Sequence, residues 1–173
     1  LDNKNIIAIR NSGIAKALLK DHQGAIDDFT KALEIEPECN ISLFNRGKAK
    51  AELKDHQGAI DDFTKALEID PRDATPYQNR SASKYFLNDF AGSIDDSNKA
   101  LEIDPDSDLS LFNRGIAKAA LKNYQDAIND YNKLLEIDPE HCESFLNRGV
   151  AKAALKDYQG AINDYNSVLE INP

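Results

Sequence analysis

Histidine, cysteine and paired carboxylates are the side chains of this chain that could carry catalysis or bind a metal. A nucleophilic thiol needs a base and an orienting group, and helical metal ligands are typically spaced four residues apart. His141 and Cys142 are adjacent in sequence and satisfy neither requirement, and Cys39 has no such partner. His22 and His56 stand where other repeats carry an aromatic ring, namely Phe90, Tyr124 and Tyr158. We therefore predict no catalytic residue, no metal site and no cofactor.

Acidic pairs recur through the chain and are the remaining candidates for acid–base chemistry. They are Asp27-Asp28, Asp61-Asp62 and Asp95-Asp96. Regular recurrence is typical of a solvated helix face with one residue turned inward, rather than of an acid–base pair. The chain contains eight glycines but no glycine-rich phosphate loop. We expect a protein that is not an enzyme.

The composition argues against two classes of partner. The chain has 21 basic and 30 acidic residues, a net charge of −9, which disfavours binding to nucleic acid or anionic lipid. No apolar run is long enough to cross a bilayer and no signal peptide opens the chain. Cys39 and Cys142 lie three repeats apart, so we expect free thiols and a cytoplasmic location. The chain begins at Leu1 and contains no methionine, so we expect a piece of a longer protein.

A proline recurs every 34 residues and defines five units. A period of this length with two helical patterns per unit predicts a solenoid, in which each unit buries its apolar face against its neighbours. A leader, residues 1–5, precedes the units, and we expect residues 6–173 to form one domain. The prolines are Pro37, Pro71, Pro105, Pro139 and Pro173, and the units span residues 6–39, 40–73, 74–107, 108–141 and 142–173.

Each unit contains two amphipathic helices. Asp or Asn precedes the second helix and can cap it, and the proline ends that helix. Glycines in the first helix predict close approach to an aromatic ring in the second, followed one turn later by a buried leucine. The glycines are Gly13, Gly47, Gly115 and Gly149, the rings Phe29, Phe63, Tyr131 and Tyr165, and the leucines Leu33, Leu67, Leu101, Leu135 and Leu169.

The phrase NRGIAKAALKNYQDAINDYNKLLEIDP, residues 113–139, resembles a tetratricopeptide repeat, and related phrases cover residues 6–173. The resemblance implies an all-α fold, a right-handed α-α superhelical solenoid of antiparallel helix pairs. It also implies a protein-binding surface on the concave side, lined by the first helix of each repeat. Lysine replaces the tyrosine that the family often carries in the first helix, at Lys16, Lys50, Lys84, Lys118 and Lys152.

Four of those five lysines follow an arginine by four residues, and an aspartate recurs once per second helix. We predict a ladder of Arg and Lys to Asp contacts that sets the register of neighbouring helices; a basic stripe for an acidic ligand is the alternative. The arginines are Arg46, Arg80, Arg114 and Arg148, and the aspartates Asp28, Asp62, Asp96, Asp130 and Asp164.

The third repeat departs from the others, because Ser81, Ser93 and Ser97 replace Gly, Ala and an aromatic residue. It also gains Tyr85 and Phe86. Either a new aromatic ring fills the lost volume, or Tyr85 projects into the groove as a ligand anchor.

The predicted groove is apolar and carries one asparagine per repeat, which suits an apolar or amphipathic peptide. An asparagine amide can pair with both backbone groups of an extended peptide, although hydrogen bonding within the scaffold explains the row equally well. In similar repeats an asparagine of this kind joins lysines and arginines to bind the terminal carboxylate of a peptide. Those basic residues are missing beside Asn45 and Asn79, which disfavours such a carboxylate clamp here. The predicted peptide-binding residues are Phe44, Asn45, Asn79, Tyr85, Phe112, Asn113, Ile116, Leu146, Asn147 and Val150.

The leading hypothesis is a non-catalytic protein–protein interaction scaffold that binds a peptide segment in its concave groove. A structural spacer or self-assembling array is one alternative, because the last helix would expose Ile162, Tyr165, Val168 and Leu169. A regulatory arm of a larger multidomain protein is the other.

Overall fold

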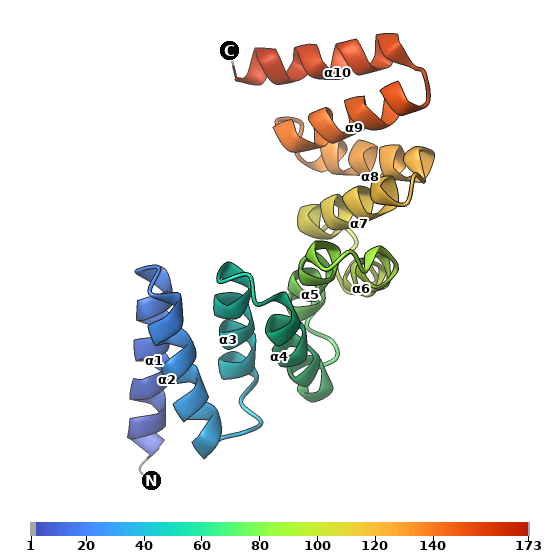
Figure 1. Ribbon diagram of the computed structural model, residues 1–173. Coiled ribbons are helices and arrows are strands. Elements are labelled where there is room, and N and C mark those ends of the chain that lie inside the picture. The colour runs from blue at the N-terminus through green and yellow to red at the C-terminus, as the bar shows by residue number, and fades with distance from the viewer. Residues whose placement is uncertain (1–2, 173) are drawn as a thin grey trace. The chain divides into compact units, whose positions relative to one another are not determined.

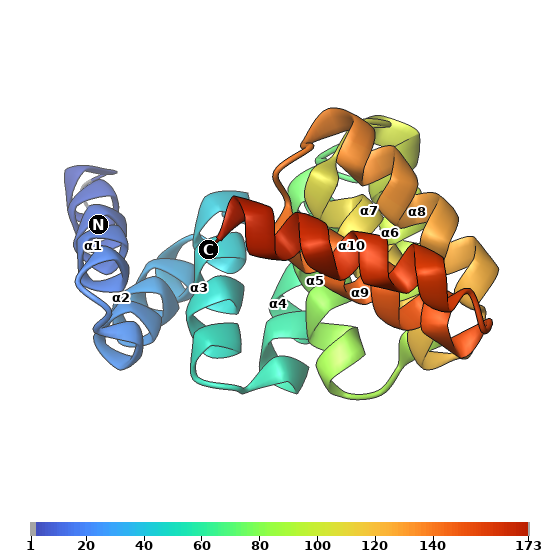
Figure 2. The same ribbon diagram turned by 90° about the horizontal axis from the view of Figure 1, so that it is seen from above.

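The computed structural model describes residues 3–172, and these form ten helices without a strand. Figures 1 and 2 show α1–α2 and α3–α4 in one part of the chain, and α7–α8 and α9–α10 in the other, as helical hairpins. The helices are α1 (Asn3–Leu18), α2 (His22–Ile35), α3 (Asn40–Glu52), α4 (His56–Ile69), α5 (Ala74–Phe86), α6 (Phe90–Ile103), α7 (Asp108–Ala120), α8 (Tyr124–Ile137), α9 (Cys142–Ala154) and α10 (Tyr158–Ile171).

The chain divides into two compact units between Leu87 and Asn88, inside the third repeat. In the first unit each helix from α1 to α4 packs on the next, and α3 also contacts both α1 and α5. In the second unit α6 to α10 pack in the same sequential way, and α7 contacts α9. The predicted all-α architecture of paired helices is confirmed. Helix α1 begins at Asn3, within the predicted leader, and the final proline, Pro173, lies outside the described residues.

The turn inside each repeat combines a strained residue with a helix cap. Lys54 adopts a φ of 65°, in the left-handed region, and Asp55 then accepts a hydrogen bond from the Gly58 amide at 2.9 Å. This cap satisfies one of the free amides of the first turn. The same cap occurs at Asp21, Asp89 and Asp157, so the predicted capping is confirmed for these aspartates.

The fourth repeat is the exception, because Asn123 precedes α8 without a capping hydrogen bond from its side chain. The residue three positions later is Asp126, where the other repeats carry glycine. A Cβ atom built at Gly58 would overlap the Asp55 carboxylate. The cap geometry therefore requires glycine at this position. The side chain of Asp126 leaves no room for the carboxylate or amide of a capping residue, so α8 has no side-chain cap.

The glycine and ring contacts predicted from the sequence hold the hairpins of the first, second, fourth and fifth repeats together. A Cβ atom at Gly47 would lie 2.7 Å from the Phe63 ring, and one at Gly115 would lie 2.6 Å from the Tyr131 ring. Both rings are fully buried. Any larger residue at these glycines would force the two helices apart.

The predicted row of buried leucines is only partly correct. Leu33, Leu67 and Leu135 are buried, whereas Leu101 is half-buried. Leu169 is 64% exposed, because no described helix follows α10.

Candidate functional site

The arginines, lysines and aspartates form a buried ion cluster in the second, fourth and fifth repeats. Arg46 donates two hydrogen bonds to Asp62, at 2.6 and 2.9 Å, and the Lys50 ammonium lies 2.7 Å from the same carboxylate. Arg114, Lys118 and Asp130 repeat this geometry, as do Arg148, Lys152 and Asp164. The predicted ladder is confirmed for these three clusters.

Each arginine also reaches the second helix of the preceding repeat. The remaining guanidinium nitrogen of Arg46, Nη1, donates to the Thr30 hydroxyl at 3.2 Å, and Arg80 donates to Thr64 at 2.9 Å. In the second unit, Arg114 donates to Asn98. One planar guanidinium thus joins three helices. These charges serve the scaffold, which removes the main support for a basic ligand-binding stripe.

The first repeat has a smaller version of the cluster, because Ser12 stands at the arginine position. Asp28 accepts a hydrogen bond from Ser12 at 2.6 Å and pairs with Lys16 at 2.7 Å. Burial raises the pKa of the Asp28 carboxyl, but the bonds from Lys16 and Ser12 outweigh it, so the net pKa lies below its usual value. The hydrogen bond to Asp28 raises the pKa of Lys16.

Two hollows lie at equivalent places between the first helices of the first unit. The His22 hollow lies between α1 and α3 and has a volume of about 210 Å³; the His56 hollow lies between α3 and α5 and has a volume of about 550 Å³. Ala82 occupies the position in the larger hollow that Lys48 occupies in the smaller one. The His22 hollow is lined by Ile14, Ala17, Leu18, His22, Asn45, Lys48, Ala49 and Glu52, and the His56 hollow by Ala51, Glu52, Lys54, His56, Asn79, Ala82, Ser83 and Phe86.

A stacked ring pair borders the His56 hollow. The rings of His56 and Phe86 lie 4.7 Å apart and within 12° of parallel, while Phe86 remains 64% exposed. The Nδ1 atom of His56 is buried without a hydrogen-bond partner in the described structure, and so is that of His22. Sequence reasoning assigned these histidines to packing and missed Phe86. The sequence did contain a sign that Phe86 is not a core residue, because the equivalent positions in the second and fourth repeats carry Glu52 and Ala120.

The predicted aromatic anchors lie closer to the core than expected. The Phe44 ring is half-buried, 5.8 Å from Phe63, and the Lys48 ammonium lies 5.7 Å from its centre. Tyr85 is half-buried and contacts Phe86 edge-on, at 6.0 Å. Neither Phe44 nor Tyr85 lines the hollows, so in the first unit the hollows contain the predicted residues Asn45 and Asn79 only.

The predicted residues of the second unit lie on α7 and α9. Phe112 is half-buried, with its ring 6.3 Å from Tyr131 and 5.3 Å from His141. Ile116 is half-buried as well. Leu146 and Val150 are 44% and 58% exposed on α9, which leaves them free to contact a ligand.

The asparagines bond first to their own helix. The side-chain amide of Asn45 donates to the Ile41 carbonyl at 2.8 Å, and Asn79 and Asn147 donate to the carbonyl four residues earlier in the same way. Asn113 is buried. The three half-buried asparagines thus keep an acceptor oxygen and one N–H for other contacts.

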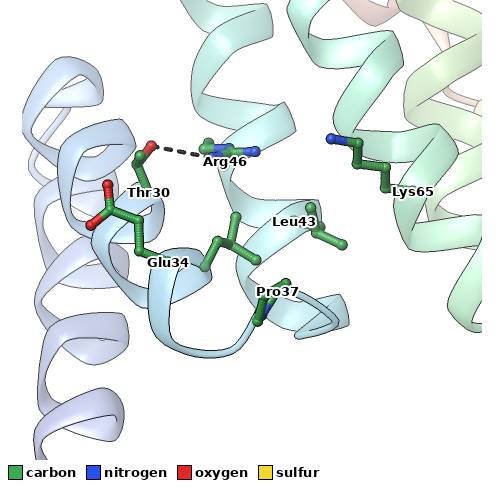
Figure 3. A pocket seen from close by; sticks show the side chains of 7 residues that line it. Thr30, Glu34, Pro37, Leu43, Arg46 and Lys65 are labelled. Carbon is green, nitrogen blue, oxygen red and sulfur yellow. Dashed lines mark hydrogen bonds between the residues drawn. The ribbon is translucent and has the colours of Figure 1, made fainter. Parts of the chain in front are cut away.

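A further hollow lies where α2 turns into α3, with a volume of about 240 Å³ (Figure 3). Pro37, Leu43 and Lys65 line it beside the Arg46 bond to Thr30. In the second unit the lysine equivalent to Lys65 is Lys133, which bonds to the Pro105 carbonyl and pairs with Asp106 at 3.3 Å. This hollow is part of the scaffold.

Within residues 3–172, no cluster of three His, Cys, Asp or Glu side chains could hold a metal ion. No helix in this range is both long and apolar enough to span a bilayer. Cys39 and Cys142 are free thiols, as predicted.

The geometry described above can be compared with known families. Two family models, each described as a tetratricopeptide repeat, match most of the chain, one over residues 41–73 and 109–141 and the other over residues 11–39 and 143–173. This chain belongs to the tetratricopeptide repeat family. The interval between the matches, residues 74–108, contains the third tetratricopeptide repeat with its serine substitutions.

Several solved structures share the fold at low sequence identity. A crystal structure of MamA is 19% identical with a TM-score of 0.90, covering 98% of this chain and 93% of that one. MamA from Desulfovibrio magneticus RS-1 is 18% identical with a TM-score of 0.90, over 96% of this chain and 94% of that one. YrrB, a tetratricopeptide repeat protein with an unusual peptide-binding site, is 20% identical with a TM-score of 0.83, over 99% and 89%. No curated protein sequence matches the chain.

Proposed function

We propose that this chain is a non-catalytic protein-interaction scaffold that binds a peptide segment along the first helices of its repeats. The pair of equivalent hollows in the first unit is the observation that carries the proposal. They occur one repeat apart, and each combines apolar side chains with an asparagine and a histidine. Family membership supports the scaffold role, because tetratricopeptide repeat proteins bind other proteins.

The hollows favour a ligand with two apolar side chains. Ala82 leaves the His56 hollow open, and the exposed face of Phe86 offers a flat apolar wall. The acceptor oxygens of Asn45 and Asn79 can receive backbone amides of an extended peptide. Glu52 lines both hollows and lies beside Lys54 in the larger one, so the charges there are mixed and a strongly acidic ligand is disfavoured.

In the second unit, Leu146 and Val150 provide a second apolar contact face on α9, with the half-buried Ile116 on α7. These residues suit the same class of ligand, an apolar or amphipathic segment. Phe112 contributes less, because its ring is committed to Tyr131 and His141.

Peptide selection followed by site-specific obstruction tests this function. Random 16-residue peptides displayed on phage are selected against the chain, and the winners are measured by fluorescence anisotropy. Ala82→Glu places a carboxylate in the His56 hollow and should weaken binding at least tenfold, because an apolar anchor would then meet an unpaired charge. Leu146→Glu tests the second unit in the same way.

Ala120→Glu is the matched control, since Ala120 is exposed and occupies the position at which the second repeat already carries Glu52. It should leave affinity within twofold, and circular dichroism should show that all variants remain helical. Selected peptides that bind all three variants equally would overturn the proposal.

A further inference from the structure

The His56 hollow has a flat wall that the equivalent hollow one repeat earlier lacks. Where the His56 hollow has Phe86, the earlier one has Glu52, and where it has Ala82, the earlier one has Lys48. A carboxylate and a long lysine chain are thus exchanged for a ring and a methyl group. The volumes are about 550 Å³ and about 210 Å³. The larger hollow therefore has room for an aromatic side chain, whereas the smaller one suits an aliphatic side chain.

The Phe86 ring is held in place and is still accessible. It stacks on His56, with ring centres 4.7 Å apart and planes within 12° of parallel, and Tyr85 meets it edge-on at 6.0 Å. The side chain nevertheless remains 64% exposed. A ring that is already fixed by its neighbours loses little freedom when a ligand packs on it. Stacked aromatic rings stabilise each other beyond the area that they bury, so this wall favours an aromatic ligand side chain over an aliphatic one.

Two charged residues of the His56 hollow restrict the polar tip of that side chain. Glu52 and Lys54 both line the hollow and are exposed, and neither forms an ion pair within residues 3–172. A ligand carboxylate would be repelled by Glu52, and a ligand ammonium by Lys54. A phenol group is neutral, and it can donate to a carboxylate and accept from an ammonium. Tyrosine therefore matches both residues, whereas phenylalanine could pair with neither.

We propose that the His56 hollow is specific for a tyrosine side chain of the bound peptide. The tyrosine ring stacks on Phe86, and its hydroxyl group donates to Glu52 and accepts from Lys54. The inference rests on the peptide binding proposed above and names the side chain that this hollow selects. Arginine is the competing occupant, because a guanidinium also stacks on a ring and pairs with a carboxylate. Lys54 disfavours it by charge repulsion.

Parallel selections from the random peptide library test the preference. The natural chain and its Phe86→Ala variant serve as targets. Tyrosine should be enriched at one position among peptides that bind the natural chain, and the enrichment should disappear with the variant. Because Phe86 is exposed, the variant should stay helical by circular dichroism. Leu87→Ala is the matched control, since Leu87 is an exposed neighbour that does not line the hollow, and it should retain the enrichment.

Peptide variants then separate the ring from the hydroxyl group. The tightest tyrosine peptide is labelled, and its affinity is measured by fluorescence anisotropy. Replacing its tyrosine by phenylalanine should weaken binding about fivefold, because the hydrogen bonds of the hydroxyl group are lost. Replacing it by leucine should weaken binding at least roughly tenfold, because stacking is lost as well.

A protein variant assigns the hydroxyl contact. Glu52→Ala introduces the residue that the fourth repeat carries at this position, and it should reduce the difference between the tyrosine and phenylalanine peptides to less than about twofold. Glu68→Ala removes an exposed carboxylate of α4 that does not line the hollow, and it should leave that difference unchanged.

The outcomes distinguish this inference from the proposed function. Peptides that Ala82→Glu obstructs but that contain no enriched tyrosine would overturn the inference alone, and so would equal affinities of the tyrosine and phenylalanine peptides. Tighter binding of a peptide with arginine at that position would assign the hollow to a cation instead. A library that yields no binding peptide would overturn both.

Discussion

The second and fourth repeats use one scaffold to present different surfaces. Both bury an aspartate between an arginine and a lysine, and both press a ring against a first-helix glycine. They differ at the start of the second helix. The second repeat has the half-buried His56 at that position, and the fourth repeat has Tyr124. The comparison teaches that repeated buried contacts leave the remaining positions free to specify a ligand.

The largest expected effect concerns a core position at which the two repeats differ. Leu134 in the fourth repeat and its equivalent Ala66 in the second are both fully buried. Leu134→Ala should lower the free energy of unfolding by about 2–5 kcal/mol, because it leaves a cavity. Urea titration followed by circular dichroism measures this. Leu121→Ala, at a leucine 44% exposed, is the control and should cost less than about 1 kcal/mol.

Loss of the buried aspartate of the ion cluster should destabilise the second and the fourth repeat to a similar extent. Asp62→Ala and Asp130→Ala each leave two cations around a buried site, and each should destabilise the chain by about 2–4 kcal/mol. Asp61→Ala, on the exposed side, should cost far less. Combining Arg114→Ala with Asp130→Ala should give a smaller loss than the sum of the single losses. Strict additivity in the denaturation data would contradict direct coupling.

Loss of the residue before the second helix should affect stability differently in the second and fourth repeats. Asp55→Ala removes a capping bond and should cost about 1 kcal/mol, whereas Asn123→Ala should have almost no effect, because Asn123 makes no such bond. Replacing Asn123 by Asp and Asp126 by Gly together should gain about 0.5–1 kcal/mol by restoring the cap. Equal losses for Asp55→Ala and Asn123→Ala in thermal melts would argue against this account.

The smallest effect is expected in acid, at the reduced cluster of the first repeat. The pKa of Asp28 is lowered in the folded chain, although burial alone raises it, because Lys16 and Ser12 bond to the carboxylate. Its contribution to stability is therefore present above the usual aspartate pKa of about 3.9 and is lost as the pH falls through the folded value.

The melting temperatures of the natural chain and Asp28→Asn should thus converge as the pH falls from roughly 5 to 2. Asp27→Asn, at the exposed neighbour, should shift little across this range. A constant difference between the natural chain and Asp28→Asn would show that the carboxylate charge has no part in the effect.

Much of the fold could be predicted because its determinants are local and repeated. The closing proline, the cap aspartate and the glycine each act within one or two helices, so their spacing alone predicts the hairpin. The ion ladder could also be predicted, since three residue types recur in fixed register. The prediction that Asn123 caps its helix like the aspartates was wrong. Asp126 excludes the cap by steric overlap, which the sequence pattern does not show.

The sites were harder to predict because exposure depends on neighbouring helices. Phe44 and Phe112 share a helix face with exposed positions, yet their rings turn onto the buried rings of Phe63 and Tyr131. The His56 hollow exists because Ala82 on α5 faces α3, and no pattern within one repeat shows this.

The sequence by itself determined the period, the helix pairs, the charge clusters and the family, because each depends on residues a few turns apart. Only the tertiary structure decided which apolar residues remain accessible. The same isoleucine and leucine positions are buried on α8 and exposed on α10. The reason is that a side chain is buried only where another helix packs over it, whatever its own residue type.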